Sequence, residues 1–340
     1  MRLWQKSMIA LARSKRVTAT MQQSAVMQPF ASRFVGGGTV AQAMKTASAL
    51  QSEDVCASLF YLGEYESDLR KITAAVNELE DCIDALAASG HQVHVSVDPT
   101  QIGSMLSWQL CAEHTEQLAQ RIAGTQTEQT SRRTIPSPLP RKVLMLDMED
   151  SGVTQQTLDL YQNLNRRNLP VAITIQTYLH RSAADLKELV RQGAMVRLVK
   201  GAFAENASLA FTGRGQMDNA YRKGIDMLFS AEALECGVYP VLGTHDHRMV
   251  AYAAEKARKN GWPDEGWEVE MLYGVRPDYC RQLVAGRRIV RLYLPYGKDW
   301  WSYSVRRLGE APRNLLFALR AIFSGSAVKK LRATGGRYAG

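Results

Sequence analysis

Eight short apolar runs recur along the chain, and this repetition limits the possible fold more than any other feature. Most positions in each run are apolar, with many β-branched or aromatic residues, which is typical of strands buried on both faces. The runs are Val55–Leu62, Val93–Val97, Val143–Leu146, Val171–Ile175, Met195–Val199, Val238–Leu242, Trp267–Leu272 and Ile289–Leu294.

Helical patterns lie between these runs, and Gly or Pro often follows them. They include Leu69–Ala88, Trp108–Ala123, Leu158–Arg167, Ala183–Gln192, Asn219–Leu234 and His247–Asn260. Eight alternating units predict an α/β fold, a (β/α)8 TIM-like barrel, because a doubly wound sheet would rarely have eight such regular units. We expect an N-terminal helical segment over 1–50, the barrel over 51–330 and a C-terminal tail over 331–340.

The chain is basic, with a formal net charge of +9, and seven Lys or Arg residues precede Glu53, the first acidic residue. Basic charge suits phosphate-bearing ligands, anionic substrates, acidic membranes or nucleic acid. The segment Arg2–Arg16 could be a membrane-touching amphipathic helix or a transit peptide, although a leading helix packed on the domain is favoured. Five scattered cysteines without a CxxC motif favour a cytosol-like compartment, and no apolar run is long enough to span a membrane.

Polar residues gather after the predicted strands, where barrels of this kind carry their active sites. Charged side chains there are costly unless they meet a ligand or one another. Lys200-Gly201-Ala202 suggests phosphate binding, because a cation precedes small residues that allow close backbone approach. The strand-end residues are Glu64, Asp98, Asp147, Met148, Glu149, Gln176, Arg197, Lys200, Thr244, His245, Asp246, Glu270, Tyr273 and Tyr293.

Three other kinds of site find little support. A metal could use the acidic pair after the third strand together with His245 and His247, but the positive charge expected at this mouth favours an anion, so no metal is predicted. No G-x-S-x-G motif is present, which disfavours acyl transfer. No G-x-G-x-x-G follows a strand, so a Rossmann site is unsupported, although barrel loops could still bind a flavin.

Two adjacent arginines, Arg306 and Arg307, stand in the first turns of a helix predicted to begin near Ser302, after a strand expected to break at Pro295 and Gly297. Adjacent helical side chains lie about 100° apart, so both guanidinium groups can lean toward one spot and bind a carboxylate there. The alternative is a solvated face on which Glu310 pairs with Arg306.

These motifs together resemble the proline dehydrogenase family, in its monofunctional bacterial form. The resemblance rests on residues 197–203 (Arg-Leu-Val-Lys-Gly-Ala-Phe), 244–246 (Thr-His-Asp), 270–274 (Glu-Met-Leu-Tyr-Gly) and the stretch Tyr293–Glu310. It implies a flavin-dependent barrel that binds FAD without a covalent link. It also implies oxidation of L-proline to Δ1-pyrroline-5-carboxylate by hydride transfer to flavin N5, as the first step of proline catabolism.

The resemblance also implies roles for individual residues. Asp147 and Arg197 would be catalytic, with Arg197 beside flavin N5 and Tyr293 shaping the pocket near Asp147. Glu64 would pair with Arg306 when substrate is absent. The substrate would be bound by Asp98, Leu272, Tyr293, Arg306 and Arg307, and the cofactor by Met148, Gln176, Arg197, Lys200, Gly201, Ala202, Thr244 and His245.

The partners implied are a small-molecule imino acid as substrate and a quinone or membrane electron-transfer chain as acceptor, with no nucleic acid. A cytoplasmic protein is expected, whose basic N-terminus could support peripheral contact with the inner face of the membrane. Two rival functions stay open. One is a related flavin enzyme, either a dehydrogenase acting on a modified proline or other imino acid, or a reductase acting on a folate. The other is a non-catalytic basic module that binds RNA or an anionic membrane.

The chain departs from the family pattern at two positions. Asp98 stands where the family has a lysine that completes the carboxylate site, and Phe203 stands where it has a tyrosine. A carboxylate facing a bound carboxylate opposes it. Asp98 therefore either changes the preferred imino acid or pairs with Arg306 or Arg307, and both alternatives stay open.

Overall fold

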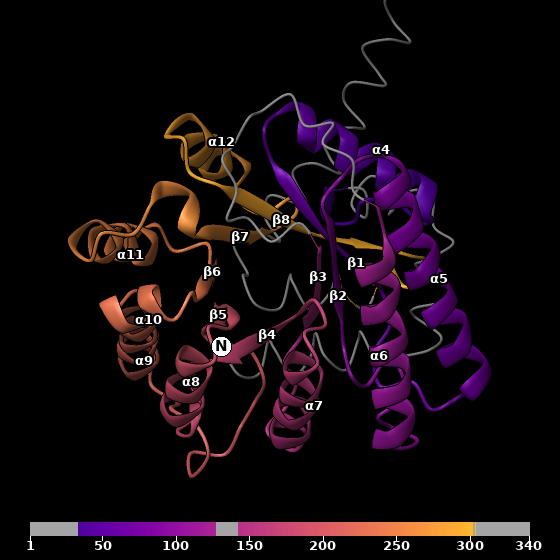
Figure 1. Ribbon diagram of the computed structural model, residues 1–340, viewed down its shortest axis with the longest axis horizontal. Coiled ribbons are helices and arrows are strands. Elements are labelled where there is room, and N and C mark those ends of the chain that lie inside the picture. The colour runs from indigo at the N-terminus through magenta and orange to yellow at the C-terminus, as the bar shows by residue number, and fades with distance from the viewer. Residues whose placement is uncertain (1–32, 127–141, 302, 304–340) are drawn as a thin grey trace, which may run out of the picture.

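The computed structural model describes residues 33–126, 142–301 and 303. Eight parallel strands close into a barrel in chain order, and helices surround it (Figure 1), which confirms the predicted fold. The strands are β1 Cys56–Tyr61, β2 Val93–Val97, β3 Lys142–Leu146, β4 Val171–Gln176, β5 Met195–Val199, β6 Tyr239–Gly243, β7 Glu268–Leu272 and β8 Val290–Tyr296.

Helices lie where the sequence predicts them, and the longer ones bury an apolar face. In α5, for example, the Asp68 side chain caps the first turn by accepting a hydrogen bond from the Arg70 amide, and Ile72, Leu79 and Ile83 are fully buried. The helices are α4 Val40–Ser52, α5 Leu69–Ala88, α6 Trp108–Gly124, α7 Thr154–Arg166, α8 Ser182–Arg191, α9 Arg214–Leu228, α10 Ala231–Glu235, α11 His247–Lys259 and α12 Pro277–Ala285, with a short 3-10 turn, η1, over Asp264–Gly266.

Two differences from the sequence predictions have a physical cause that the structure shows. The helix predicted over Asn219–Leu234 is two helices, α9 and α10, because Ser230 adopts an extended conformation and caps α10 through the Ala233 amide. The strand was predicted to break at Pro295 and Gly297; β8 continues through Pro295 and ends at Tyr296, directly before Gly297. Strand β7 has already ended beside Tyr293, so the missing N–H of Pro295 costs no hydrogen bond on that side.

The segment before α4 forms backbone hydrogen bonds with the end of β8. The Gly36 amide donates to the Pro295 carbonyl at 2.7 Å, and the Gly297 amide donates to the Gly37 carbonyl at 2.9 Å. The helix α4 then covers the same side of the barrel with Ala43 and Ala47 fully buried. Within the part of the chain that the structure describes, no helix is both long and apolar enough to cross a membrane.

The barrel interior is divided into an apolar half and a polar half. The apolar half comes from β3 to β6 and forms its own cluster, which includes Met145, Ala172, Tyr239 and Val241. The polar half comes mainly from β1, β2, β7 and β8, with one arginine from β5. Its buried residues are Ser58, His94, Ser96, Arg197, Glu268, Glu270 and Arg291. Such polar groups are stable inside a barrel only when they bond one another.

Candidate active site

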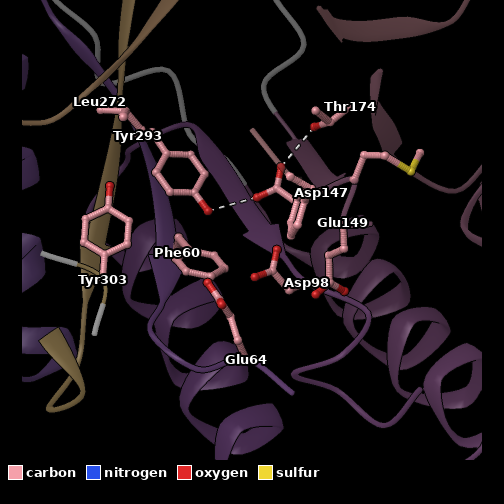
Figure 2. A pocket seen from close by; sticks show the side chains of 11 residues that line it. Phe60, Glu64, Asp98, Asp147, Glu149, Thr174, Leu272, Tyr293 and Tyr303 are labelled. Atoms are coloured by element: carbon pink, nitrogen blue, oxygen red, sulfur yellow. Dashed lines mark hydrogen bonds between the residues drawn. The ribbon is translucent and has the colours of Figure 1, made fainter. Parts of the chain in front are cut away.

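A cavity of about 180 Å³ opens at the carboxyl ends of the strands. The predicted residues Asp98, Asp147, Met148, Leu272 and Tyr293 all line it, which brings together side chains that lie in β7 and β8 or directly after β2 and β3. Figure 2 shows how Asp98, Asp147, Leu272 and Tyr293 surround one space. The rest of the lining is Phe60, Glu64, Glu149, Thr174, Phe203 and Tyr303.

Arg197 lies beneath this cavity, and each of the five N–H groups of its guanidinium has an acceptor. Nε and Nη2 donate to the two carboxylate oxygens of Glu270 at 2.7 and 2.8 Å. Nη1 donates to Asp147 Oδ1 and faces Thr174 Oγ1 at 3.4 Å, and the remaining Nη2 hydrogen reaches Ser96 Oγ at 2.9 Å. The neighbouring carboxylates hold the pKa of Arg197 above its ordinary value against the cost of burial, so it stays charged.

Asp147 is fixed on three sides. Its Oδ1 accepts from Arg197 and from the Thr174 hydroxyl at 3.0 Å, and its Oδ2 accepts from the Tyr293 hydroxyl at 2.9 Å (Figure 2). Burial is the main cause that raises the pKa of Tyr293 well above its ordinary value, and the charge of Asp147 adds to it. Tyr293 is therefore a permanent donor, and the carboxylate of Asp147 keeps one orientation.

The described part of the lining is acidic. Figure 2 shows Glu64, Asp98, Asp147 and Glu149 around the same space, and no Lys or Arg is among the lining residues that the structure describes. The positive charge expected at this mouth also rested on Arg306 and Arg307, which lie outside the described residues, so the described lining does not test that expectation. The two expected cations that the structure describes are paired with carboxylates, and the first of them, Arg197, bonds Glu270 and Asp147. The second of them, Lys200, meets Asp218 at 2.5 Å and Asp246 at 3.4 Å.

Glu149 has a larger part in the site than its place in the sequence indicates. Its two oxygens accept from the amide and hydroxyl of Thr100 at 2.9 and 2.5 Å, and its carbonyl accepts from the Gln176 amide group at 2.6 Å. Burial raises its pKa to about 7, and the nearby charge of Glu64 adds to the effect while Thr100 opposes it. The run of acidic residues directly after β3 was the signal available in the sequence.

The other predicted cofactor residues lie at the ends of β4, β5 and β6, outside the lining of the 180 Å³ cavity. Gly201 has φ +105°, and a Cβ there would lie 2.2 Å from the Tyr178 ring, so only glycine fits. The Thr244 hydroxyl accepts from the Asp246 amide at 3.1 Å, and His245 faces the Leu272 amide at 3.3 Å. The residues predicted here are Gln176, Lys200, Gly201, Ala202, Thr244 and His245.

Two predicted substrate residues, Arg306 and Arg307, lie outside the described residues, as does the predicted partner role of Arg306 for Glu64. A helix has begun by Trp300, close to the start expected near Ser302. In residues 33–126, 142–301 and 303, no group of three or more His, Cys, Asp or Glu side chains is arranged to hold a metal ion.

Comparison with known proteins identifies relatives of this chain. A family model described as proline dehydrogenase matches residues 43–318. The proline dehydrogenase 1 of Bacillus subtilis (strain 168) is 31% identical over 292 residues, which cover 86% of this chain and 90% of that protein. The proline dehydrogenase of Deinococcus radiodurans is 30% identical over 329 residues, 95% of this chain and 99% of that protein.

Solved structures of similar fold are longer chains. Proline utilization A from Bdellovibrio bacteriovorus superposes with a TM-score of 0.72 at 22% identity, covering 83% of this chain and 32% of that one. The same protein from Corynebacterium freiburgense gives 0.69 at 19% identity, covering 95% and 34%. This chain therefore spans about a third of their length, and at these identities the likeness shows the barrel fold alone.

Proposed function

Because this chain belongs to the proline dehydrogenase family of oxidoreductases, we propose that it oxidises L-proline to Δ1-pyrroline-5-carboxylate with non-covalent FAD, as the first step of proline catabolism. The observation that carries the proposal is the meeting of Asp147, Arg197 and Tyr293 at one small cavity. A buried, charged arginine held by two carboxylates belongs at a site where charge changes during a reaction.

The loops after β4, β5 and β6 suit a phosphate-bearing flavin. Gly201 leaves its backbone open where a side chain would collide with Tyr178, and Lys200 is 28% exposed, so it can turn from Asp218 toward a phosphate. FAD, when bound, would supply the oxidising ring that accepts a hydride. The residues that would hold it are Met148, Gln176, Arg197, Lys200, Gly201, Ala202, Thr244 and His245.

The protein's own part is to bind, orient and exclude water. An imino acid carries a cationic ring nitrogen, which the acidic lining attracts. Phe60, Leu272 and the Tyr293 ring give the cavity an apolar wall on which a saturated ring can pack. Asp147, locked by Tyr293 and Thr174, offers a carboxylate that needs no reorganisation as charge shifts in the substrate.

The substrate carboxylate needs a cation, and we assign that role to Arg306 and Arg307. The lining described by the structure is acidic, so the positive charge must come from another part of the chain. The helix that begins by Trp300 continues from the end of β8 beside the cavity, and Tyr303 on it lines the cavity. This supports a position of the arginine pair within reach of the same space.

We further propose that a quinone of a membrane electron-transfer chain accepts electrons from the reduced cofactor. The support is the basic charge of the chain, which suits peripheral contact of a cytoplasmic protein with an anionic membrane face. Reduction of a soluble quinone analogue during proline turnover tests this assignment.

An absorbance spectrum of the purified protein tests the proposal as a whole. A yellow protein whose flavin absorbance bleaches on addition of L-proline supports it. A colourless protein that takes up no FAD on reconstitution contradicts it.

A second candidate is a dehydrogenase of the same kind that prefers a hydroxylated or N-substituted proline. Asp98 favours it, because this carboxylate is only 8% exposed and lies in the cavity wall. Asp98→Lys should then improve the apparent affinity for L-proline by more than tenfold. If the variant instead loses activity that the wild type has, Asp98 orients the arginine pair and proline is the substrate.

A further inference from the structure

Arg197 is held from below as well as from the cavity side. Its Nη2 donates to Ser96 Oγ at 2.9 Å and lies 3.4 Å from Ser58 Oγ. The two serine hydroxyls are 3.1 Å apart, and Ser58 Oγ is 2.9 Å from His94 Nδ1. All three residues are fully buried. A continuous hydrogen-bonded chain therefore runs from the arginine through two strands into the middle of the barrel.

Arg197 determines which group donates and which accepts in each of these hydrogen bonds. A guanidinium can only donate, so Ser96 Oγ accepts from Arg197 and its own hydrogen must point elsewhere. Ser58 Oγ is the acceptor within reach, and Ser58 in turn reaches His94 Nδ1. With this direction each hydroxyl hydrogen has an acceptor. Among the described residues this direction leaves one buried group without a partner, the His94 Nε2 hydrogen, whereas the reverse direction leaves two, the Ser96 hydrogen and the His94 Nε2 lone pair. Each unsatisfied buried group costs free energy, so the first direction is favoured.

We propose that Ser96, Ser58 and His94 are positioning residues for Arg197, with neutral His94 as the final acceptor through an unprotonated Nδ1. For its effect on the reaction, this inference rests on the proposed function. The orientation of Arg197 toward the cavity would depend on His94, a histidine that never contacts a ligand. The imidazole proton then lies on Nε2, which is buried without a hydrogen-bond partner among the described residues.

The surroundings of His94 favour its neutral form. Below it, Arg291 donates to both oxygens of Glu268 at 2.6 and 3.0 Å, and above it lies the Arg197–Glu270 pair. Burial lowers the pKa of His94 well below its ordinary value, and the positive charges of Arg291 and Arg197 lower it further. A second cation beside Arg197 would also repel it, so a neutral acceptor is the arrangement that leaves the arginine undisturbed.

Nitrogen NMR of histidine-labelled protein tests the tautomer directly, whether or not cofactor is bound. The His94 signals, assigned by their loss in His94→Asn, should report an unprotonated Nδ1 and a protonated Nε2 and should not titrate near neutral pH. A protonated Nδ1, or a signal that titrates near neutral pH, would overturn the proposal.

A matched pair of variants tests the positioning role. His94→Asn keeps an acceptor near the Nδ1 position, whereas His94→Leu removes it at comparable size. The leucine variant should lower the reduction potential of the bound flavin and slow single-turnover hydride transfer at least tenfold, while the asparagine variant stays within about threefold of wild type.

Gln92→Leu is the control for loss of stability alone. It removes a 2.8 Å acceptor of Arg291 in the lower ion pair and leaves the contacts of Arg197 in place. It should lower the unfolding temperature without moving the flavin potential. If His94→Leu, like this control, lowers the unfolding temperature without moving the flavin potential, the hydrogen bonds from Arg197 to His94 are only structural and the proposal fails. A protein that binds no flavin would refute the proposed function, and the NMR result would still decide this inference.

Discussion

Replacing Arg197 with methionine should remove a large part of the protein's stability at neutral pH. The guanidinium and the Glu270 carboxylate form a two-point ion pair in which the side chains are only 5% and 3% exposed. Removing one partner of such a pair leaves an uncompensated buried charge and costs about 3–5 kcal/mol in the free energy of unfolding. Asp147 would lose the same partner, which places the expected cost in the upper part of that range.

The cost should depend on pH, and its sign can be derived. Burial already raises the pKa of Glu270, and Arg197 opposes this rise. Without Arg197 the folded-state pKa rises further above the unfolded value. As pH increases between the two values, the folded state keeps a proton that the unfolded state releases, so the free energy of unfolding falls by up to about 1.4 kcal/mol per pH unit. The deficit of Arg197→Met should therefore shrink as pH falls toward about 5.

Urea unfolding of both proteins at several pH values, followed by circular dichroism, measures this deficit. Arg248→Met is the control, because Arg248 also pairs with an aspartate but its side chain is 55% exposed, and this variant should unfold close to the wild-type midpoint at each pH. A loss below about 1 kcal/mol for Arg197→Met, or a loss that does not change with pH, would refute the reasoning.

Three further predictions concern the cavity and its loops. Arg306→Met or Arg307→Met should weaken substrate binding by about 2–4 kcal/mol and leave flavin binding unchanged, measured by titration with a carboxylate-bearing ring analogue; unaltered affinity in both variants would contradict the assigned role. Gly201→Ala should cost about 1–3 kcal/mol in flavin retention, since its φ of +105° and its contact with Tyr178 exclude a side chain, and flavin release on dilution measures it. Glu149→Gln should gain stability relative to wild type as pH rises from about 4.5 to about 7, because a folded-state pKa raised to about 7 makes wild-type stability fall over that window; parallel pH profiles would count against this.

The barrel could be predicted because its strands are buried on both faces and show as separate apolar runs. The polar half of its interior could not, since Ser58, His94 and Ser96 look like ordinary small or polar residues within those runs until the barrel brings them to one arginine. A partial signal was present. Arg197 and Arg291 lie inside apolar runs and need buried partners. Glu268 and Glu270 are two positions apart in β7 and therefore point to the same face, as such partners must.

The charge of the cavity was the other feature that could not be predicted from the sequence. Lys200 follows a strand as a phosphate ligand would, but sequence alone does not reveal that Asp218 and Asp246 lie beside it. Pairs between distant loops depend on how the helices pack, and no local pattern encodes them. Residues that meet within one strand-end motif, such as Asp147 and Glu149, were easier to place than residues that meet across the barrel.

The seam where the barrel closes has a consequence for how the chain folds. Strand β1 pairs with β8 along its whole length, from Cys56 opposite Arg291 to Tyr61 opposite Tyr296. Arg291 also donates to the Ala57 carbonyl, 234 positions away in the sequence. Contacts between residues so far apart in the sequence form only after a long loop has closed, and closing it costs conformational entropy. Such contacts therefore slow folding. Ring closure should therefore be a late event, and until it occurs the unpaired edges of β1 and β8 are open to pairing with other chains.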